Sequence, residues 1–400
     1  MKILLVHSRY RSTAPSGENR VVEQEFEALV ALGHDIEAFV RHSDEIESWP
    51  TWRKATLPAR VIWNPASRRD LAEALDRFRP DVVHIHNTFP MLSPSVLYAC
   101  RDAGVPVVVT LHNYKLLCAS GSFFRDGAVC HDCAGGNPTP ALIHGCYRGS
   151  VLATVPTVLS ARTHRRAWRD LVSAYVFVSD SQRRLLAGID FDPERTFVKH
   201  NLVPYDGPVG AARRRQVAYL ARLDPAKGAP LLMKAWDTYR ALAGDDALRL
   251  VIAGSGPLHD EVAAWAEDRP SVELAGHLTK QECFKLIGRS RAVILPSQWE
   301  ETFGLVAVEA MAVGVPLLAA GHGSFPDLVS DGVDGALFEP GRPDTLAKLL
   351  LDVDTSPARY KEYGRRARTT YEDKHDPGRN IEQLLDIYRF AIGHSVSACR

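Results

Sequence analysis

The chain has 400 residues, of which 46% are hydrophobic, enough apolar material for two or three domains with separate cores. Its 48 Lys and Arg balance 48 Asp and Glu, so the net charge gives no support for a nucleic-acid-binding protein. No run of eighteen or more apolar residues is present, and the apolar run in "MKILLVHSRY" is too short for a signal peptide. We therefore expect a soluble, cytoplasmic protein.

Short apolar runs alternate with helical patterns through the first half of the chain. "KILLV" predicts a strand, a helix with apolar positions at helical spacing follows, and "IEAFV" predicts the next strand. The segments "VVHIH", "VPVVVTLHN" and "SAYVFVS" continue this alternation. Such alternation is typical of a parallel sheet with helices on both faces, so residues 1–205 are predicted to form one α/β domain.

A second alternation begins after the linker-like stretch "GPVGAARRR", which is rich in Gly, Pro and charge. Its predicted strands lie in "QVAYLARL", "LRLVIAG", "SVELAG", "RAVILPS" and "VPLLAAG". We expect a second Rossmann-like domain over residues 206–375 and a final helical segment at 376–400. Ligands of such sheets bind beyond the carboxyl ends of the strands, which makes the loops after these strands the candidate sites.

Two loops of the second half carry residues suited to phosphate. Arg222 and Lys227 follow the first strand, and Gly254 and Gly256 form a turn after the next one. The two cations have an alternative interpretation as solvated surface residues. The glycines would either let a ligand approach the backbone or only make a tight strand-to-helix turn.

The stretch "PSQWEETFGLVAVEAMAVGVPLLAA" places two carboxylates, Glu301 and Glu309, around a predicted helix start near Thr302. Free amides at such a start form an anion site, and carboxylates accept hydrogen bonds from vicinal hydroxyls. A sugar nucleotide has this layout of sugar, diphosphate and ribose. The alternative is that Glu309 is only a paired polar residue on a half-buried helix. Its apolar neighbours leave it little solvated face, however, and a buried unpaired carboxylate is costly, which favours a ligand. The amides assigned to this site are those of Phe303, Gly304 and Leu305.

These residues resemble the retaining glycosyltransferases of family 4. "EETFGLVAVEA" is similar to their Glu-x7-Glu signature, and "ARLDPAKG" is similar to their Arg-x4-Lys phosphate clamp. The resemblance covers nearly the whole chain. It implies a GT-B fold, in which two Rossmann-like domains face a central cleft. The first would bind the acceptor, the second the nucleotide sugar, and the final helix would cross back to the first.

The resemblance also implies roles for single residues. Glu301 would bind the donor sugar hydroxyls, Glu309 the ribose, and the amides after Glu301, with Thr302, the sugar and phosphate. Arg222 and Lys227 would neutralise the leaving diphosphate in place of a metal ion, so no catalytic cofactor is expected.

In the first half, Gly17 in "TAPSGENRVV" is similar to the family's glycine-rich loop near the diphosphate, although Ser16 replaces the usual first glycine. His112 in "VVVTLHN" occupies the position of the family's cleft histidine, which contacts the donor sugar. Without the resemblance, His112 would equally be a structural histidine at the end of an apolar strand.

The predicted activity is metal-independent, retaining transfer of a sugar, of hexosyltransferase type, from a UDP-, GDP-, ADP- or dTDP-sugar to a hydroxyl acceptor. Polysaccharide, cell-envelope glycan and glycosylated natural-product biosynthesis all fit. The alternatives are a sugar-nucleotide epimerase or a phosphorylase on the same fold, or a nucleotide-sugar-binding protein without turnover. A dinucleotide-dependent oxidoreductase is disfavoured because "HSRYRSTAPSGEN" lacks the G-x-G-x-x-G turn.

A cysteine-rich insertion is predicted over residues 116–148. Its C-x11-C-x2-C-x12-C spacing predicts a structural zinc site, with an iron–sulfur cluster, a redox disulfide or unlinked thiols as alternatives. We expect the insertion to serve acceptor recognition because it follows His112 directly. The four cysteines are Cys118, Cys130, Cys133 and Cys146.

The segment "SVLATVPTVLSARTHRRAWRDLV" combines apolar positions with four arginines, a pattern that predicts a basic amphipathic helix. Such a helix either contacts an anionic bilayer or packs on the protein with a solvated face. The first alternative would place the protein peripherally at the inner face of a membrane. The acceptor is accordingly expected to be a saccharide, a lipid-linked molecule or a small molecule.

Overall fold

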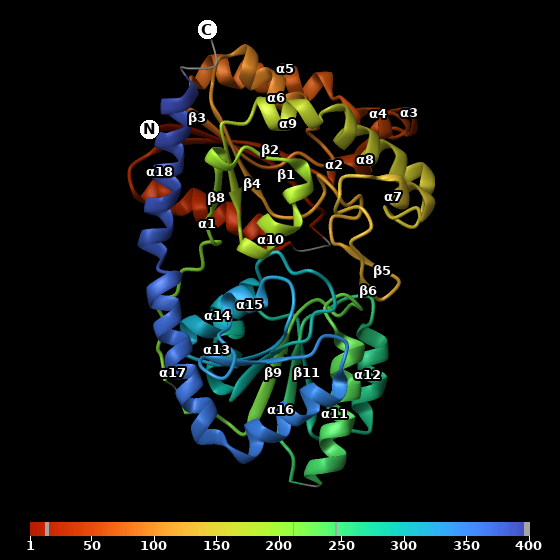
Figure 1. Ribbon diagram of the computed structural model, residues 1–400, viewed down its shortest axis with the longest axis vertical. Coiled ribbons are helices and arrows are strands. Elements are labelled where there is room, and N and C mark those ends of the chain that lie inside the picture. The colour runs from red at the N-terminus through yellow and green to blue at the C-terminus, as the bar shows by residue number, and fades with distance from the viewer. Residues whose placement is uncertain (13–15, 211, 245, 396–400) are drawn as a thin grey trace. The chain divides into compact units, whose positions relative to one another are not determined.

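The computed structural model describes residues 1–400 except 13–15, 211, 245 and 396–400 (Figure 1). The chain divides into two compact units, each built on a parallel six-stranded sheet. The first unit comprises Met1–Phe123, His131–Leu202 and the chain end from Pro377. The second comprises Phe124–Cys130 and Val203–Asp376.

The sheet of the first unit is parallel throughout, with β1 paired to β2 and β3, and β4 paired to β3 and β7. In spatial order its strands are β2 (Asp35–His42), β1 (Lys2–Arg9), β3 (Val82–Asn87), β4 (Val107–Leu111), β7 (Ala174–Phe177) and β8 (Thr196–Val198).

Thirteen helical segments belong to this unit among the described residues. They are α1 (Gly17–Ala31), α2 (Glu45–Ser48), α3 (Thr51–Ala55), α4 (Leu57–Ile62), α5 (Pro65–Phe78), α6 (Ser95–Asp102), α7 (Thr139–Ile143), α8 (Val151–Thr163), α9 (Arg165–Asp170), α10 (Asp180–Leu185), the 3₁₀ turns η1 (Ala187–Ile189) and η2 (Pro193–Arg195), and α18 (Pro377–Ser395).

Alternate residues of each strand point to opposite faces of the sheet. Leu4 and Val6 of β1 therefore pack with α5, α6 and α9, while Ile3 and Leu5 pack with α1 and α18. The last helix thus completes a core that begins at the first strand (Figure 1). On the α1 and α18 face the carboxyl-terminal half of the sheet turns polar, since β1, β3 and β4 lead into histidines there.

The second unit has the strand order β11 (Val272–Gly276), β10 (Arg249–Ala253), β9 (Gln216–Leu220), β12 (Ala292–Leu295), β13 (Leu317–Ala320) and β14 (Gly335–Phe338). Its helices are α11 (Ala229–Ala243), α12 (His259–Glu267), α13 (Lys280–Arg289), α14 (Leu305–Val313), α15 (Phe325–Leu328), α16 (Pro343–Thr355) and α17 (Pro357–Lys374). The hairpin β5 (Phe124–Arg125) and β6 (Ala128–Val129) is also counted with this unit.

Helices cover both faces of this second sheet. Trp236 and Tyr239 of α11 pack with Leu346 and Leu350 of α16 in the core on one face. On the other face α13 contacts β9, and α14 contacts β12, β13 and α17. This arrangement leaves the carboxyl ends of β9, β10 and β12 leading into the loops predicted to carry the site.

The predicted α/β architecture of two parallel sheets is confirmed. The sequence pattern did not indicate β8 and β14, because they are edge strands of three and four residues. One boundary was wrong: α14 begins at Leu305, not near Thr302. Among the described residues, no helix combines the length and apolar character needed to cross a bilayer.

Candidate functional site

Three loops of the second unit start at neighbouring strands. The order β10-β9-β12 means that the loops after these strands leave the same edge of the sheet. Arg222 and Lys227 follow β9, Gly254 and Gly256 follow β10, and Glu301 follows β12. The topology therefore gathers the residues predicted for the donor site at one sheet edge.

The glycines of the second loop hold it against the first. Gly254 has φ +138°, and a Cβ there would lie 1.9 Å from the carbonyl oxygen of Ala221. A Cβ on Gly256 would lie 2.4 Å from the carbonyl oxygen of Leu223. The close approach that requires these glycines is thus to the neighbouring loop, and contact with a ligand remains a prediction.

Lys227 and Glu301 form the ion pair at the centre of this edge. The Lys227 Nζ donates to Glu301 Oε1 at 2.5 Å, and the Ser297 hydroxyl donates to the same oxygen at 2.8 Å. Glu301 is nearly buried, with 8% of its side chain exposed, against 29% for Lys227. The ammonium also lies 4.8 Å from the ring centroid of Trp299. Neither Ser297 nor Trp299 was predicted from the sequence as a site residue.

The ion pair keeps the Glu301 carboxyl ionised. Burial acts to raise its pKa, but the charge and hydrogen bond of Lys227, with the Ser297 hydroxyl, hold the pKa below its usual value. Arg222 is paired as well, since its Nε lies 3.0 Å from Asp224 Oδ2. Asp224 also accepts from the backbone N–H of Lys227 at 2.8 Å. Each cation of the predicted phosphate clamp therefore has a carboxylate partner within its own unit.

Gly304 explains why α14 starts later than predicted. It has φ +83°, a left-handed conformation outside the helical region, and a Cβ there would lie 2.8 Å from Phe325 Cε1. The helix therefore begins at Leu305, after this N-cap. Its first N–H groups have no partner within the helix and carry the positive end of the helix dipole.

The two carboxylates of the Glu-x7-Glu pattern do not lie on one continuous helix. Glu309 lies on α14 and is 4% exposed, whereas Glu301 lies in the preceding loop. The backbone from Glu301 to Gly304 is not helical, so a helical rise over all eight residues does not apply. Thr302 and Phe303 are in the same loop, and the carbonyl of Phe303 accepts from the Ser324 hydroxyl at 2.8 Å.

His112 follows β4 in the first unit and belongs to a line of histidines. Its Nε2 lies 3.0 Å from His86 Nδ1, and the two rings stack at an interplanar angle of 18°. Burial and the neighbouring His7 and His84 lower the pKa of His112 well below its usual value. His112 is thus a neutral imidazole whose orientation is fixed by His86.

Gly17 is the first residue of α1, and Ser16 caps that helix by accepting from the Glu18 N–H at 3.2 Å. Residues 13–15 of the predicted glycine-rich loop lie outside the described residues. Burial raises the pKa of Glu18 to about 8, against opposing hydrogen bonds from Asn87 and Asn113. Its Oε1 and His7 Nδ1, 3.8 Å apart, have no hydrogen-bond partner among the described residues.

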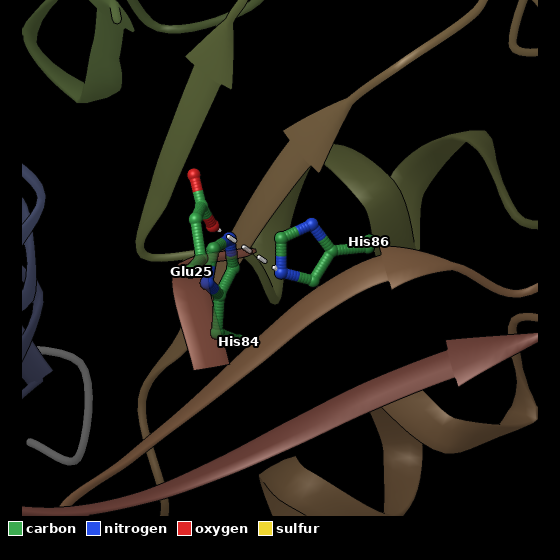
Figure 2. Close-up of side chains that lie close together, drawn as sticks. All are labelled: Glu25, His84 and His86. Carbon is green, nitrogen blue, oxygen red and sulfur yellow. Dashed lines mark ion pairs between the residues drawn. The ribbon is translucent and has the colours of Figure 1, made fainter. Parts of the chain in front are cut away.

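Figure 2 shows a second buried group, Glu25, His84 and His86, whose ligand-type atoms lie within 4.8 Å of one another. The Lys199 ammonium lies 2.8 Å from Glu25 Oε1. His84 uses both nitrogens, with Tyr388 at 2.7 Å and Thr110 at 2.8 Å. The Lys199 ammonium already neutralises Glu25, and both ring nitrogens of His84 already take part in hydrogen bonds. The group therefore fits a structural network and not a metal centre.

The predicted four-cysteine zinc site stays a prediction. Cys118, Cys133 and Cys146 belong to the first unit, and they are not among the described groups whose ligand atoms approach within 4.8 Å. Cys133 packs with Ala119 and Ala141, and Cys146 against that small apolar cluster. The Cys118 sulfur lies 3.1 Å from the Ser120 hydroxyl. Cys130 is half-buried and is counted with the second unit.

The cysteine-rich segment does line a cavity of the first unit, with a volume of about 330 Å³. Its walls come from the segment after β4 and from α8, α9 and η1, and they carry three cationic side chains. These are Lys115, Arg162 and Arg165.

Comparison with known proteins identifies the family. Residues 209–370 match the description "Glycosyl transferases group 1", and residues 16–202 match "Glycosyl transferase 4-like domain". The glycogen synthase of Mycobacterium tuberculosis is 26% identical over 407 residues, covering 92% of this chain and 89% of that protein.

Solved structures share the fold over nearly the whole chain. Anabaena HepE in complex with UDP has a TM-score of 0.65 at 17% identity, covering 96% of this chain and 99% of that chain. Sucrose-phosphate synthase of Thermosynechococcus elongatus has a TM-score of 0.66 at 16% identity, covering 97% and 98%. At these identities the likeness shows the GT-B fold. Together with the two family matches, it places the chain among the group 1, family 4 glycosyltransferases, which take their sugar from a nucleotide sugar.

Proposed function

We propose that this glycosyltransferase is a metal-independent, retaining enzyme of hexosyltransferase type whose donor site is the sheet edge formed by the loops after β9, β10 and β12. The Lys227–Glu301 ion pair beside the α14 N-terminus carries the proposal, because cationic, anionic and backbone donor groups meet there. A nucleotide sugar needs all three: cations and amides for the diphosphate, and a carboxylate for sugar hydroxyls.

In this proposal Lys227 and Arg222 stabilise the negative charge that develops on the departing diphosphate. The amides at the start of α14, from Phe303 to Leu305, bind the phosphate next to the sugar, with Thr302 in the same loop. Glu301 accepts from the sugar hydroxyls and Glu309 from the ribose. Gly254 and Gly256 keep backbone at van der Waals distance from the diphosphate.

Donor binding then requires an exchange of ionic partners. Without a ligand, Lys227 is bound to Glu301 and Arg222 to Asp224, so the positive charge is neutralised. A diphosphate competes for both cations, and a Lys227 that turns toward phosphate releases an oxygen of Glu301 for a sugar hydroxyl. The two steps support each other, which favours an intact nucleotide sugar over its separate parts.

We also propose roles for residues of the first unit. We propose His112 as a donor-sugar contact and Gly17 as part of a diphosphate loop, because they follow the carboxyl ends of β4 and β1, two strands of the same sheet. We place the acceptor in this unit, where the cavity between the cysteine-rich segment and α8 offers three cations to an acidic acceptor group. The polysaccharide, envelope-glycan or natural-product context, and a cytoplasmic location, are part of the same proposal.

HepE is described in complexes with UDP and with UDP-glucose, which makes a UDP-sugar the first donor to test. A thermal-shift panel of UDP-, GDP-, ADP- and dTDP-sugars should show one class that stabilises the protein. A ligand at a hundred times its Kd adds about 2.7 kcal/mol. Lys227→Ala should abolish this shift, whereas Lys234→Ala, an exposed lysine on α11, should retain it.

Turnover assays separate the alternatives. A transferase releases nucleotide only when an acceptor is present, an epimerase changes the sugar without releasing nucleotide, and a phosphorylase requires inorganic phosphate. A protein that binds a donor but never consumes it would be a binding protein. Donor binding that is equally strong in Lys227→Ala would place the donor elsewhere and contradict the proposal.

A further inference from the structure

Helix α8 of the first unit exposes its large apolar side chains. Val151, Leu152, Val155 and Leu159 are 51%, 86%, 43% and 45% exposed. At about 100° per residue these four positions share one arc of roughly 100° around the helix. Arg162, also exposed, falls on the same arc.

The opposite side of α8 faces the protein and carries small polar residues. Thr154, Thr157 and Ser160 are buried. Ser160 donates to the carbonyl of Val61 at 3.0 Å, and His164, just after the helix, contacts the carbonyl of Ile62 at 3.0 Å. This is the reverse of an ordinary surface helix, which turns its apolar stripe inward. Folding gains little from side chains this exposed, least of all from Leu152, so they indicate a surface that is covered by something else.

The neighbouring segments extend the apolar surface. Helix α4 packs beside α8, and α3 precedes it with Trp52, which is 70% exposed. Helix α7 contacts α8 and carries Ile143, which is 69% exposed. Figure 1 shows α3, α4, α7 and α8 gathered at one corner of the first unit. We call this corner the α3–α8 surface.

The two segments that form this surface carry Lys and Arg but no acidic residue. Residues 48–69 and 133–169 contain ten Lys and Arg and no Asp or Glu, although the whole chain has 48 of each kind in 400 residues. At that average about seven acids would be expected in these 59 residues. Three of the ten form ion pairs with carboxylates that lie outside the two segments: Arg68 with Asp102, Arg69 with Asp70, and Arg169 with Asp170. Among the described residues the other seven have no carboxylate within ion-pair distance: Arg53, Lys54, Arg60, Arg148, Arg162, Arg165 and Arg166.

Exposed apolar side chains together with cations that have no carboxylate partner match the interface of an anionic bilayer. Leucine, valine and tryptophan enter the acyl boundary, while arginine and lysine bind acidic headgroups. An acidic peptide or a nucleic acid would satisfy the cations but would leave Leu152 and Trp52 in water. We propose that the α3–α8 surface docks this protein peripherally on membranes that contain acidic phospholipids. This proposal does not depend on the identity of the donor or the acceptor.

The test is cosedimentation of the full chain with vesicles of phosphatidylcholine and phosphatidylglycerol at 7:3. The wild type should bind these vesicles, bind pure phosphatidylcholine at least ten-fold more weakly, and lose affinity for the anionic vesicles in high salt. Leu152→Ser/Leu159→Ser should weaken binding about ten-fold or more. Lys54→Gln and Arg166→Gln should each weaken it roughly five-fold.

Matched controls lie in the second unit. Leu242→Ser removes a leucine that is 59% exposed on α11, and Lys234→Gln removes an exposed charge from the same helix. Both should bind vesicles like the wild type. All variants should nearly keep the wild-type melting temperature and keep the transfer rate to a water-soluble acceptor, because the changed leucines are 45–86% exposed and the changed cations are exposed as well.

Failure of the wild type to bind anionic vesicles at low salt would overturn the proposal. So would equal binding by Leu152→Ser/Leu159→Ser and Leu242→Ser. Sedimentation velocity adds a decisive alternative: a wild-type dimer that the double leucine variant converts to a monomer, without vesicle binding, would assign the surface to a second copy of the chain.

Discussion

The Lys227–Glu301 ion pair stabilises a carboxylate that water hardly reaches. Without the ammonium, Glu301 would keep the Ser297 hydroxyl at 2.8 Å but would lose its counter-charge. We expect Lys227→Ala to lower the free energy of unfolding of the ligand-free protein by about 1–3 kcal/mol, the range for a buried acceptor that loses its partner. Urea denaturation measures this, with Lys234→Ala as the control for losing a lysine.

A double variant separates this structural role from the catalytic one. In Lys227→Ala/Glu301→Gln the uncompensated charge is gone, so most of the lost stability should return while sugar transfer stays abolished. If Lys227→Ala and Lys234→Ala unfold at the same urea concentration, the pair adds nothing to stability. Lys227 would then act on the ligand alone.

The position of helix α14 depends on the conformation of Gly304. Its φ of +83° and the nearby Phe325 ring leave no room for a side chain. Gly304→Ala should therefore cost about 1–3 kcal/mol of stability, and should also raise the donor Kd because the helix start is displaced. Gly314→Ala is the matched control at the other end of α14, with φ +77°. It should destabilise the protein without weakening donor binding in isothermal titration calorimetry. Equal effects of both variants on the donor Kd would contradict a donor site at the helix N-terminus.

The same elements show which features of the fold and the site can be predicted from the sequence and which cannot. Apolar runs such as "LRLVIAG" specify buried parallel strands, because both faces of such strands are covered, and these predictions were confirmed. The start of α14 was misplaced because only the packing of Phe325 shows that Gly304 must adopt a left-handed conformation. The partners Ser297 and Asp224 were missed for a similar reason. Their hydrogen bonds depend on loop geometry that no spacing encodes. The zinc site predicted from the cysteine spacing stays a prediction, and the structure adds that Cys133 packs against Ala119 and Ala141.

At the scale of the whole molecule, buried titratable groups are distributed unevenly, with a line of histidines in the first sheet. Burial lowers the pKa of His7 and of His84 to about 4, and lowers that of His86 well below its usual range. Between pH 6.5 and 4 the unfolded chain therefore binds more protons than the folded one, so stability falls as the pH falls through this window. Glu301 in the second unit, whose pKa is lowered, loses its contribution only at more acidic pH.

We therefore expect mild acid to loosen the first unit before the second. At pH 5.5 a histidine with a pKa of 6.5 unfolded and about 4 folded costs about 1.4 kcal/mol, so His7 and His84 together cost roughly 3 kcal/mol.

Glu18, with a pKa raised to about 8, acts in the opposite direction, because its folded carboxyl holds a proton that the unfolded chain releases above about pH 4.5. Glu18→Gln removes that opposing contribution and should steepen the loss of stability on acidification. Hydrogen exchange corrected for the intrinsic rate at each pH, compared between pH 7 and 5.5, should show protection lost in β1, β3 and β4 while β9 and β12 stay protected. Equal loss in both sheets would mean that the histidine line does not govern the acid response.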